Sequence, residues 1–213
     1  MTDRLNKIFS VIEKCSVFAD IGCDHGYMTK AMLDSGKCER AICSDVSAKC
    51  LEKAENLLSD YISQGRVKSV VSDGFDNVGR CDVALIAGMG GEEICTIIER
   101  APTLPERLVL QPMKNADKVR LCAVKQGYRI EKDFIFKSAG KFYVLISLVK
   151  GRDSLTQDEV EFGRDNLKYP TVEFREFIKL RKDMIDKLIK SDALSDQSRT
   201  QLILERKKLE ELC

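Results

Sequence analysis

Residues 17–27 read VFADIGCDHGY, and this stretch decides the fold of the chain. The apolar run that ends at Asp20 is typical of a buried strand. Gly22 and Gly26 then allow a tight turn before a helix-compatible segment that begins at Tyr27. A strand, a glycine-bearing turn and the start of a helix build the ligand crevice at the carboxyl edge of a parallel sheet. The stretch therefore predicts an α/β fold with a ligand site around Asp20.

The charge of this turn indicates which kind of ligand it takes. Dinucleotide-binding folds use G-x-G-x-x-G because a pyrophosphate must lie against bare backbone. Here Asp24 stands in place of the middle glycine, and its carboxylate would repel a pyrophosphate. A cationic ligand without phosphate, such as S-adenosylmethionine, fits this charge, with Asp20 facing its ammonium group. His25, the only histidine, lies in the same turn, where we expect contact with the ligand or a supporting hydrogen bond.

Strand-like and helix-like segments alternate through the first 150 residues. The strand-like runs lie near 17–21, 40–44, 67–71, 82–87 and 107–111, and the helix-like segments near 27–35, 47–62, 91–100 and 116–126. Such strand–helix units predict a parallel sheet that is covered on both faces. Two β-rich runs, 129–136 and 141–149, are joined by the four residues 137–140 and predict a hairpin. We therefore expect seven strands, mostly parallel, with one antiparallel strand at the end.

The chain changes character at about residue 150. An amphipathic helix is expected before the first strand. The last 63 residues contain only two glycines, and their apolar residues form two stripes at helical spacing. The stripes are Phe174, Phe177, Ile178, Met184, Ile185 and Leu188, followed by Leu194, Leu202, Leu209 and Leu212. A turn at Ser191–Asp192 and a helix N-cap at Ser195 would separate them. We expect an α/β domain over residues 1–150 and a coiled-coil-like helical hairpin over residues 151–213.

The composition limits the classes of protein to consider. The 213 residues carry a formal net charge of +1, which neither favours nor excludes a polyanionic partner. Nine cysteines without a C-x-x-C pair are typical of reduced thiols, and with a single histidine they make a metal site unexpected. The first residues are charged and amphipathic, and no apolar run is long enough to cross a membrane. We expect a cytoplasmic protein.

Acidic residues follow the second and third strands. Asp45 lies 25 residues after Asp20, where a carboxylate can accept hydrogen bonds from ribose hydroxyls, and Val46 follows it at the same strand end. A capping role for Asp45 at the next helix is the alternative. Asp73 and Gly74 follow the third strand, where the carboxylate can accept the amino group of an adenine, although Asp-Gly is also a common turn pair.

The fourth and fifth strands end in residues that suit a substrate pocket. Residues 87–91 read AGMGG, and their glycines allow the backbone at Ala87, Gly88, Met89 and Gly90 to approach a ligand closely. A tight strand-to-helix turn is the simpler alternative. Gln111 ends the fifth strand, where it could donate a hydrogen bond to the edge of a base or merely terminate the strand.

Taken together, these motifs resemble one bacterial family, the tRNA (adenine-22-N1)-methyltransferases. The stretches that carry the resemblance are DIGCDHGYMT (20–29), CSDVS (43–47), VVSDGFD (70–76), DVALIAGMGG (82–91), LVLQP (108–112) and KFYVLI (141–146). They cover roughly residues 3–150, and IAGMGG after DIGCDHGY is the most specific element. Where the family commonly continues LQPN, this chain has Met113 and Lys114 after Pro112.

The resemblance implies a class I, Rossmann-like methyltransferase fold with a C-terminal coiled-coil hairpin, S-adenosylmethionine as cofactor, no metal, and tRNA as partner. Its cofactor-binding residues would be Asp20, Gly22, Asp24, His25, Gly26, Asp45, Val46, Asp73, Gly74, Ala87 and Gly88. Its catalytic residues, at the target base, would be Asp24, Gly88, Met89, Gly90 and Gln111. We expect no obligate protein partner and a monomer rather than a dimer.

Three other functions remain open at this stage. A nicotinamide oxidoreductase would also use an acidic residue at Asp45, although Asp24 in the turn disfavours it. A methyltransferase could act on ribosomal RNA, a protein or a small molecule, since the N/D-P-P-Y loop of amino-methylating enzymes is missing here. A non-catalytic RNA-binding module is the third alternative, but it would have little need for Asp20, Asp45 and Asp73 together.

Overall fold

The computed structural model describes residues 1–190 and 194–212, so the turn expected at Ser191–Asp192 lies outside the described residues. The strands are β1 Cys15–Ile21, β2 Cys38–Asp45, β3 Val67–Val71, β4 Val83–Met89, β5 Arg107–Pro112, β6 Tyr128–Ser138 and β7 Lys141–Lys150. The helices are α1 Asp3–Val11, α2 Tyr27–Asp34, α3 Ala48–Leu57, α4 Ser59–Ser63, α5 Gly91–Arg100, α6 Ala116–Lys125, α7 Gln157–Phe162, α8 Arg164–Lys168, α9 Val172–Ile189 and α10 Asp196–Glu210.

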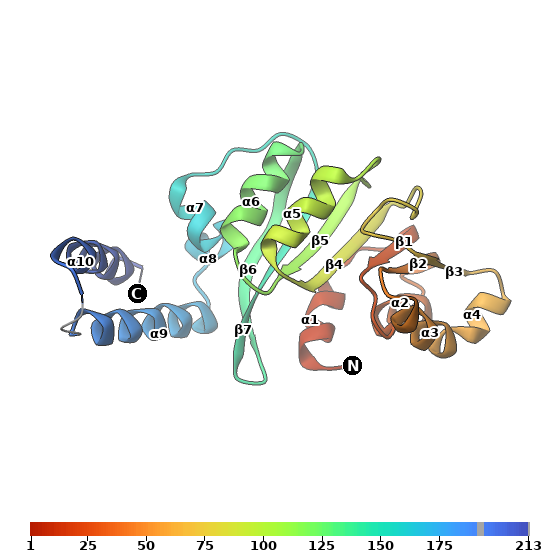
Figure 1. The fold of residues 1–213 in the computed structure, drawn as a ribbon, viewed down its shortest axis with the longest axis horizontal. Helices are drawn as coiled ribbons and strands as arrows, with labels where there is room; N and C mark the ends of the chain where they lie inside the picture. The colour runs from red at the N-terminus through yellow and green to blue at the C-terminus, as the bar shows by residue number, and fades with distance from the viewer. Residues whose placement is uncertain (191–193, 213) are drawn as a thin grey trace.

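The strands form one twisted sheet in the order β3-β2-β1-β4-β5-β7-β6 (Figure 1). β1 is parallel to both of its neighbours, and Asp20 stands level with Cys43 of β2 and Leu85 of β4. β7 runs antiparallel to β5 and β6. The predicted seven-stranded, mostly parallel sheet is confirmed. The chain passes from β1 outward to β2 and β3 and then returns to β4, so the strand order reverses between β1 and β4.

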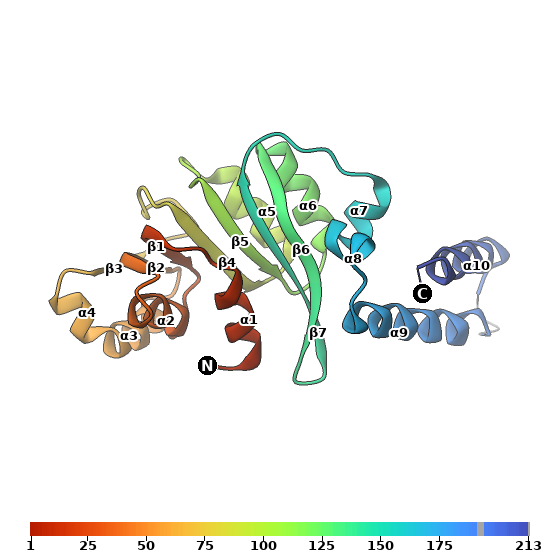
Figure 2. The same cartoon turned by 180° about the vertical axis from the view of Figure 1, so that it is seen from behind.

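Helices cover both faces of the sheet, as Figures 1 and 2 show. On one face, α1, α2 and α3 bury Ile8, Met32 and Leu51 against the strands. On the other face, α5 and α6 bury Ile94 and Val119. Since both faces are covered, the central strands are apolar on both sides, which is why they read as continuous apolar runs in the sequence.

Two local predictions need correction. The helix expected over residues 47–62 is interrupted at Leu58, which ends α3 and precedes the separate helix α4. The hairpin loop is shorter than the four residues expected, since β6 continues to Ser138 and β7 begins at Lys141. Ala139 and Gly140 form the loop with φ values of 47° and 76°. Two successive positive φ values are typical of the tight turn whose twist matches that of antiparallel strands.

Two long helices follow the sheet, as predicted, and they run antiparallel. Arg181 of α9 pairs with Glu205 of α10, and Asp186 pairs with Arg206. Ser195 caps α10 by accepting a hydrogen bond from the Ser198 amide (3.2 Å). The predicted apolar stripe of α9 is too wide, since Met184 and Leu188 are at least half exposed. The short helices α7 and α8 were not predicted. The division at residue 150 remains a prediction.

A buried ion pair joins the sheet to the C-terminal helices. Arg120 of α6 is almost fully buried, and its Nε and Nη2 donate to the two carboxylate oxygens of Asp133 on β6 (2.7 and 2.9 Å). Its Nη1 donates to the carbonyl of Val160 in α7 (2.9 Å). The backbone of Gly163, with φ +86°, lies against this ion pair. A Cβ added there would lie 2.7 Å from Asp133 Oδ1 and 2.8 Å from Arg120 Nη2.

We therefore expect Gly163→Ala to lower the free energy of unfolding by at least about 3 kcal/mol, because it strains the backbone and displaces a buried charge from its partner. Gly79→Ala is the matched control, since Gly79 has φ +80° and nothing within 4 Å of its Cβ position. It should cost only the backbone strain of about 1–2 kcal/mol. Urea denaturation measures both, and equal losses would contradict this role of Gly163.

In the described parts of the chain, no helix is both long and apolar enough to span a membrane.

Candidate functional site

A cavity of about 380 Å³ lies at the carboxyl edge of the sheet, where the strand order reverses between β1 and β4. Open α/β sheets bind ligands at this position. The cavity is lined by Arg4, Leu5, Asp20, Gly22, Cys23, Asp24, His25, Tyr27, Met28, Asp45, Leu85, Ala87, Gly88, Met89 and Met113. We call it the edge cavity. It brings together the ends of β1, β2 and β4 with the first residues of the chain.

Asp20 forms the floor of the edge cavity, and only 5% of its surface is exposed. The hydroxyl of Thr29 in α2 donates to its Oδ2 (2.9 Å). Burial raises the pKa of Asp20 from 3.8 to about 6, although the hydrogen bonds from Thr29 partly oppose this effect. Within the described residues, no Lys or Arg forms an ion pair with Asp20. A buried carboxylate without a cation favours binding of a cationic group beside it.

The turn after Asp20 is fastened to β2 by backbone hydrogen bonds. The amides of Gly22 and Cys23 donate to the carbonyl of Ser44 (2.8 and 2.9 Å). Gly22 has φ +71°, and an added Cβ there would lie 2.1 Å from Cε of Met89. The methyl group of Met89 thus packs directly on the backbone of the turn, which only a residue without a side chain allows.

Asp24 and Gly26 complete this turn. Asp24 also has positive φ, at 49°, a conformation that Asp tolerates better than most residues. Gly26, with φ +72°, forms the N-cap of α2 and packs against Ala54 and Leu58 rather than lining the cavity. Gly26 therefore shapes the turn: its positive φ allows α2 to begin beside the cavity.

Asp45 makes the contact of the capping alternative, and the ribose contact remains a prediction. Its Oδ1 accepts from the amide of Ser47 before α3 (2.8 Å), and its Oδ2 accepts from the amide of Asp24 (3.2 Å). It therefore holds the turn of β1 to the end of β2 while its carboxylate also lines the cavity. The neighbouring Val46 is exposed and does not line the cavity.

His25 and Asp24 lie at the rim of the cavity. Nδ1 of His25 is 2.8 Å from Oδ2 of Asp24, and both side chains are substantially exposed. The imidazole stacks on the ring of Tyr27, with centroids 5.6 Å apart. This arrangement suits contact with a ligand at the mouth of the cavity.

The end of β4 supplies the opposite wall. The pairing of β4 with β5 shifts register between Ala87 and Met89, and Gly88 has φ +83° in this bulge. Ala87, Gly88 and Met89 all line the cavity, whereas Gly90 is the N-cap of α5 and lies outside it. The amide of Met113 donates to the carbonyl of Met89 (2.8 Å), which joins this wall to the end of β5.

Besides Gly26, Val46 and Gly90, three further predicted residues lie away from the edge cavity: Asp73, Gly74 and Gln111. Gln111 is fully buried, and its Oε1 accepts from Nη1 of Arg4 (2.9 Å), so it positions a cavity residue instead of facing the cavity. Asp73 pairs with Arg100 of α5 (3.1 Å). Gly74 packs on Ile97, where an added Cβ would lie 2.9 Å from that side chain.

The sequence did not single out several residues that line the cavity: Arg4, Leu5, Tyr27, Met28, Leu85 and Met113. Arg4 and Leu5 belong to the amphipathic helix α1, which was predicted. Their place at the cavity depends on how α1 docks under the sheet edge, and no local pattern encodes that docking.

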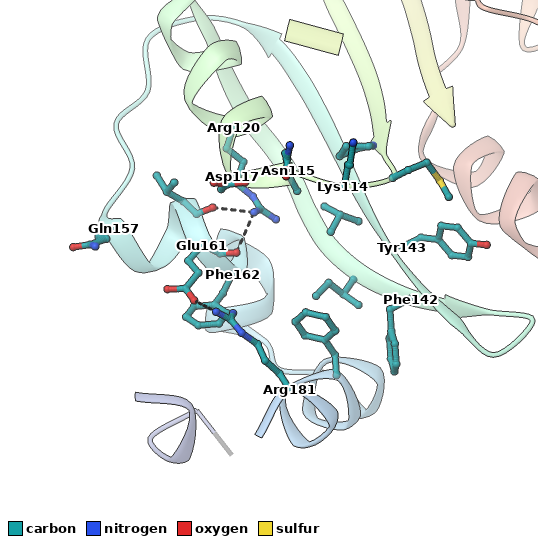
Figure 3. Close-up of a pocket in the computed structure, with 17 residues that line it drawn as sticks. Lys114, Asn115, Asp117, Arg120, Phe142, Tyr143, Gln157, Glu161, Phe162 and Arg181 are labelled. Carbon is teal, nitrogen blue, oxygen red and sulfur yellow. Dashed lines mark hydrogen bonds and ion pairs between the residues drawn. The ribbon is translucent and has the colours of Figure 1, made fainter. Parts of the chain in front are cut away.

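A second cavity, of about 550 Å³, lies between the sheet, α6, α7 and α9 (Figure 3). We call it the junction cleft. Aromatic side chains from β7, α7 and α9 line it, and residues 112–117 line its side towards the edge cavity. Met113 lines both cavities.

Neither a metal centre nor a disulfide is found in the described part of the chain. Across residues 1–190 and 194–212, no group of three or more His, Cys, Asp or Glu residues could hold a metal ion. The eight cysteines in these ranges are free. The edge cavity therefore has only its carboxylates, its backbone and its flanking side chains with which to bind a ligand.

The model of the methyltransferase domain family matches residues 1–146, and the chain belongs to this family. The tRNA (adenine(22)-N(1))-methyltransferase of Bacillus subtilis is 29% identical over 160 residues, which cover 72% of this chain and 67% of that protein. The resemblance to these tRNA methyltransferases is thereby confirmed, and the S-adenosylmethionine cofactor that it implied agrees with a methyltransferase domain.

Solved structures show the same fold. The crystal structure of the B. subtilis M1A22 tRNA methyltransferase TrmK superposes with a TM-score of 0.85 at 23% identity, over 100% of this chain and 98% of that chain. M. capricolum TrmK, in complex with S-adenosyl-homocysteine, gives 0.89 at 20% identity, over 99% and 96%. The superposed length includes the C-terminal helices.

Asp20→Asn should stabilise the ligand-free protein above pH 6. The raised pKa means that the folded state holds the Asp20 proton more tightly than the unfolded state, so stability falls as pH rises from about 4 to about 6. The difference between pKa values of 3.8 and about 6 corresponds to about 3 kcal/mol. The asparagine keeps an acceptor for Thr29 and removes this penalty. Thermal unfolding at pH 5 and pH 8 measures the effect, and a variant that gains nothing at pH 8 would contradict it.

Proposed function

We propose that this methyltransferase transfers a methyl group from S-adenosylmethionine to N1 of an adenine in tRNA, at position 22 as in the named B. subtilis relative. The observation that carries the proposal is the buried, unpaired carboxylate of Asp20 at the point where the strand order reverses. It fits a ligand with a positively charged group, and M. capricolum TrmK, which shares this fold, binds S-adenosyl-homocysteine, whose ammonium is such a group.

The edge cavity fits the parts of this cofactor. Asp20 would accept hydrogen bonds from the ammonium group. The missing Cβ at Gly88 lets the methionine portion approach the backbone there, whereas the methyl group of Met89 packs against the backbone at Gly22. Asp45 keeps free lone pairs for the ribose hydroxyls besides the two amide hydrogen bonds that it accepts. When bound, the cofactor supplies an activated methyl group on a sulfonium.

The protein needs no strong base for this reaction. The N1 atom of adenine has an in-plane lone pair and is largely unprotonated at neutral pH. Catalysis is therefore mainly alignment of the base and exclusion of water, for which Met89 and Met113 provide apolar walls. The methylated base gains a positive charge. The Asp24 carboxylate or the backbone carbonyls at Gly88–Gly90 would accept a hydrogen bond from the amino group of the base and so stabilise that charge.

The target adenine must leave its stack to react. N1 lies on the Watson–Crick edge, so the base has to rotate out of any pairing and enter the mouth of the cavity. Sequence-independent contacts with the tRNA backbone would then hold the substrate, with α9 and α10 as a clamp beside the sheet.

Methyl transfer to tRNA tests the proposal directly. The protein is incubated with tritiated S-adenosylmethionine and an unmodified tRNA transcript, and the nucleosides of the product are separated. We expect label only in 1-methyladenosine, and none when the target adenine is replaced by guanosine. Cofactor binding by calorimetry without transfer to tRNA would contradict the tRNA substrate and leave another methylation substrate.

Asp20→Asn should weaken S-adenosylhomocysteine binding by about 100-fold or more at pH 8, because a neutral amide cannot balance the ammonium group in a buried site. Asp76→Asn is a control, since Asp76 pairs with Arg100 outside the edge cavity. Calorimetry measures both dissociation constants. Unchanged affinity for Asp20→Asn would contradict its role as the ammonium partner.

A further inference from the structure

Two observations connect the junction cleft to the edge cavity. Met113 lines both, and the neighbouring Pro112 and Lys114 line the junction cleft. Arg4, which lines the edge cavity, has its guanidinium 5.7 Å from the ring centroid of Tyr143, which lines the cleft. A polynucleotide with one base in the edge cavity would therefore meet the cleft directly beyond Met113.

The walls of the junction cleft suit a nucleobase. Phe142 of β7 and Phe177 of α9 are half-buried and line the cleft, and they form its aromatic wall. The ring of Tyr143, the next residue of β7, points away from Phe142 in Figure 3 and stacks on Phe136, with centroids 5.6 Å apart. The rings of Phe142 and Phe177 contact each other edge to face, with centroids 5.7 Å apart, which fixes their orientation. Aromatic side chains of this kind stack on bases irrespective of sequence.

Among the described residues that line the cleft, one cation forms no ion pair. Arg120 is neutralised by Asp133, and Arg181 pairs with Glu161 and Glu205. Lys114 is exposed and forms no ion pair with a carboxylate of the described residues. It lies at the side of the cleft next to Met113, where the backbone of a polynucleotide would pass from one cavity to the other.

One carboxylate opposes this arrangement. Asp117 lines the cleft in the first turn of α6, and it forms no ion pair within residues 1–190 and 194–212. It would repel a phosphate near Lys114. Removal of the Asp117 charge should therefore strengthen tRNA binding, whereas removal of the Lys114 charge should weaken it.

We propose that the junction cleft binds the nucleotide adjoining the target adenine, with its base against the aromatic wall and its phosphate at Lys114. The proposal rests on tRNA being the substrate. The cleft would make the substrate contact two sites at once, so the target base enters the edge cavity already aligned. The substrate site would then extend from the strand ends to the surface between the sheet and α9.

Kinetics on a tRNA transcript test the phosphate contact. Lys114→Gln should raise KM for tRNA about five- to ten-fold and reduce the slope of log(kcat/KM) against log salt by about 0.7–0.9. The kcat at saturation and the dissociation constant of S-adenosylhomocysteine should not change. Lys118→Gln is the matched control, because Lys118 pairs with Glu92 and lines neither cavity. Asp117→Asn should lower KM.

The aromatic wall is tested at Phe142. Phe142→Leu should raise KM for tRNA about five-fold or more, whereas Phe142→Tyr, which keeps the ring, should remain close to the unmodified protein. Unchanged KM and salt slope in both Lys114→Gln and Phe142→Leu would overturn the proposal, as would equal impairment of Phe142→Leu and Phe142→Tyr. Failure of the proposed function gives a different result, since the unmodified protein would then bind the cofactor without methylating tRNA.

Discussion

The burial of Asp20 at the carboxyl end of the central strand is the constraint on which the site depends. β1 lies between β2 and β4, and its last residues are covered on both faces, so the carboxylate loses most of its water. The only side-chain hydrogen bond that it accepts within the described residues comes from Thr29, and no cation accompanies it. The fold thus carries an unfavourable charge at neutral pH, and a cationic ligand offsets the cost. Gly22 lets the methyl group of Met89 pack against the turn that follows Asp20.

The same edge explains how remote segments serve one site. Asp45 fastens the turn after β1 to β2, the Met89 carbonyl holds Met113 beside β4, and buried Gln111 holds Arg4 over the cavity. The ion pair of Arg120 and Asp133 then fixes α7 against the sheet and so shapes the junction cleft. Each of these contacts orders a group that a substrate would meet, so binding needs little further ordering of the protein.

Local patterns in the sequence predicted the sheet, the glycine turn and the strand-end acids, because strand and helix periods and glycine positions are encoded locally. Asp20 and Asp45 lie where those patterns placed them. The side chains of Gln111 and Asp73 are positioned by long-range partners, Arg4 and Arg100, which no local pattern reveals. Leu58 interrupted a helix that periodicity read as continuous. The short helices α7 and α8 follow from a capping box at Thr156 and from Gly163, signals too brief to stand out in advance.

The titration of the Asp20 carboxyl carbon by NMR, with and without S-adenosylhomocysteine, tests the central claim most directly. In the free protein, burial should place this pKa at about 6. Binding should lower it by about 2 units or more, because the ammonium group favours the ionised carboxylate. Asp20→Asn assigns the signal. A pKa near 4 in the free protein, or one that does not change on binding, would contradict the account of a buried carboxylate held for a cationic cofactor.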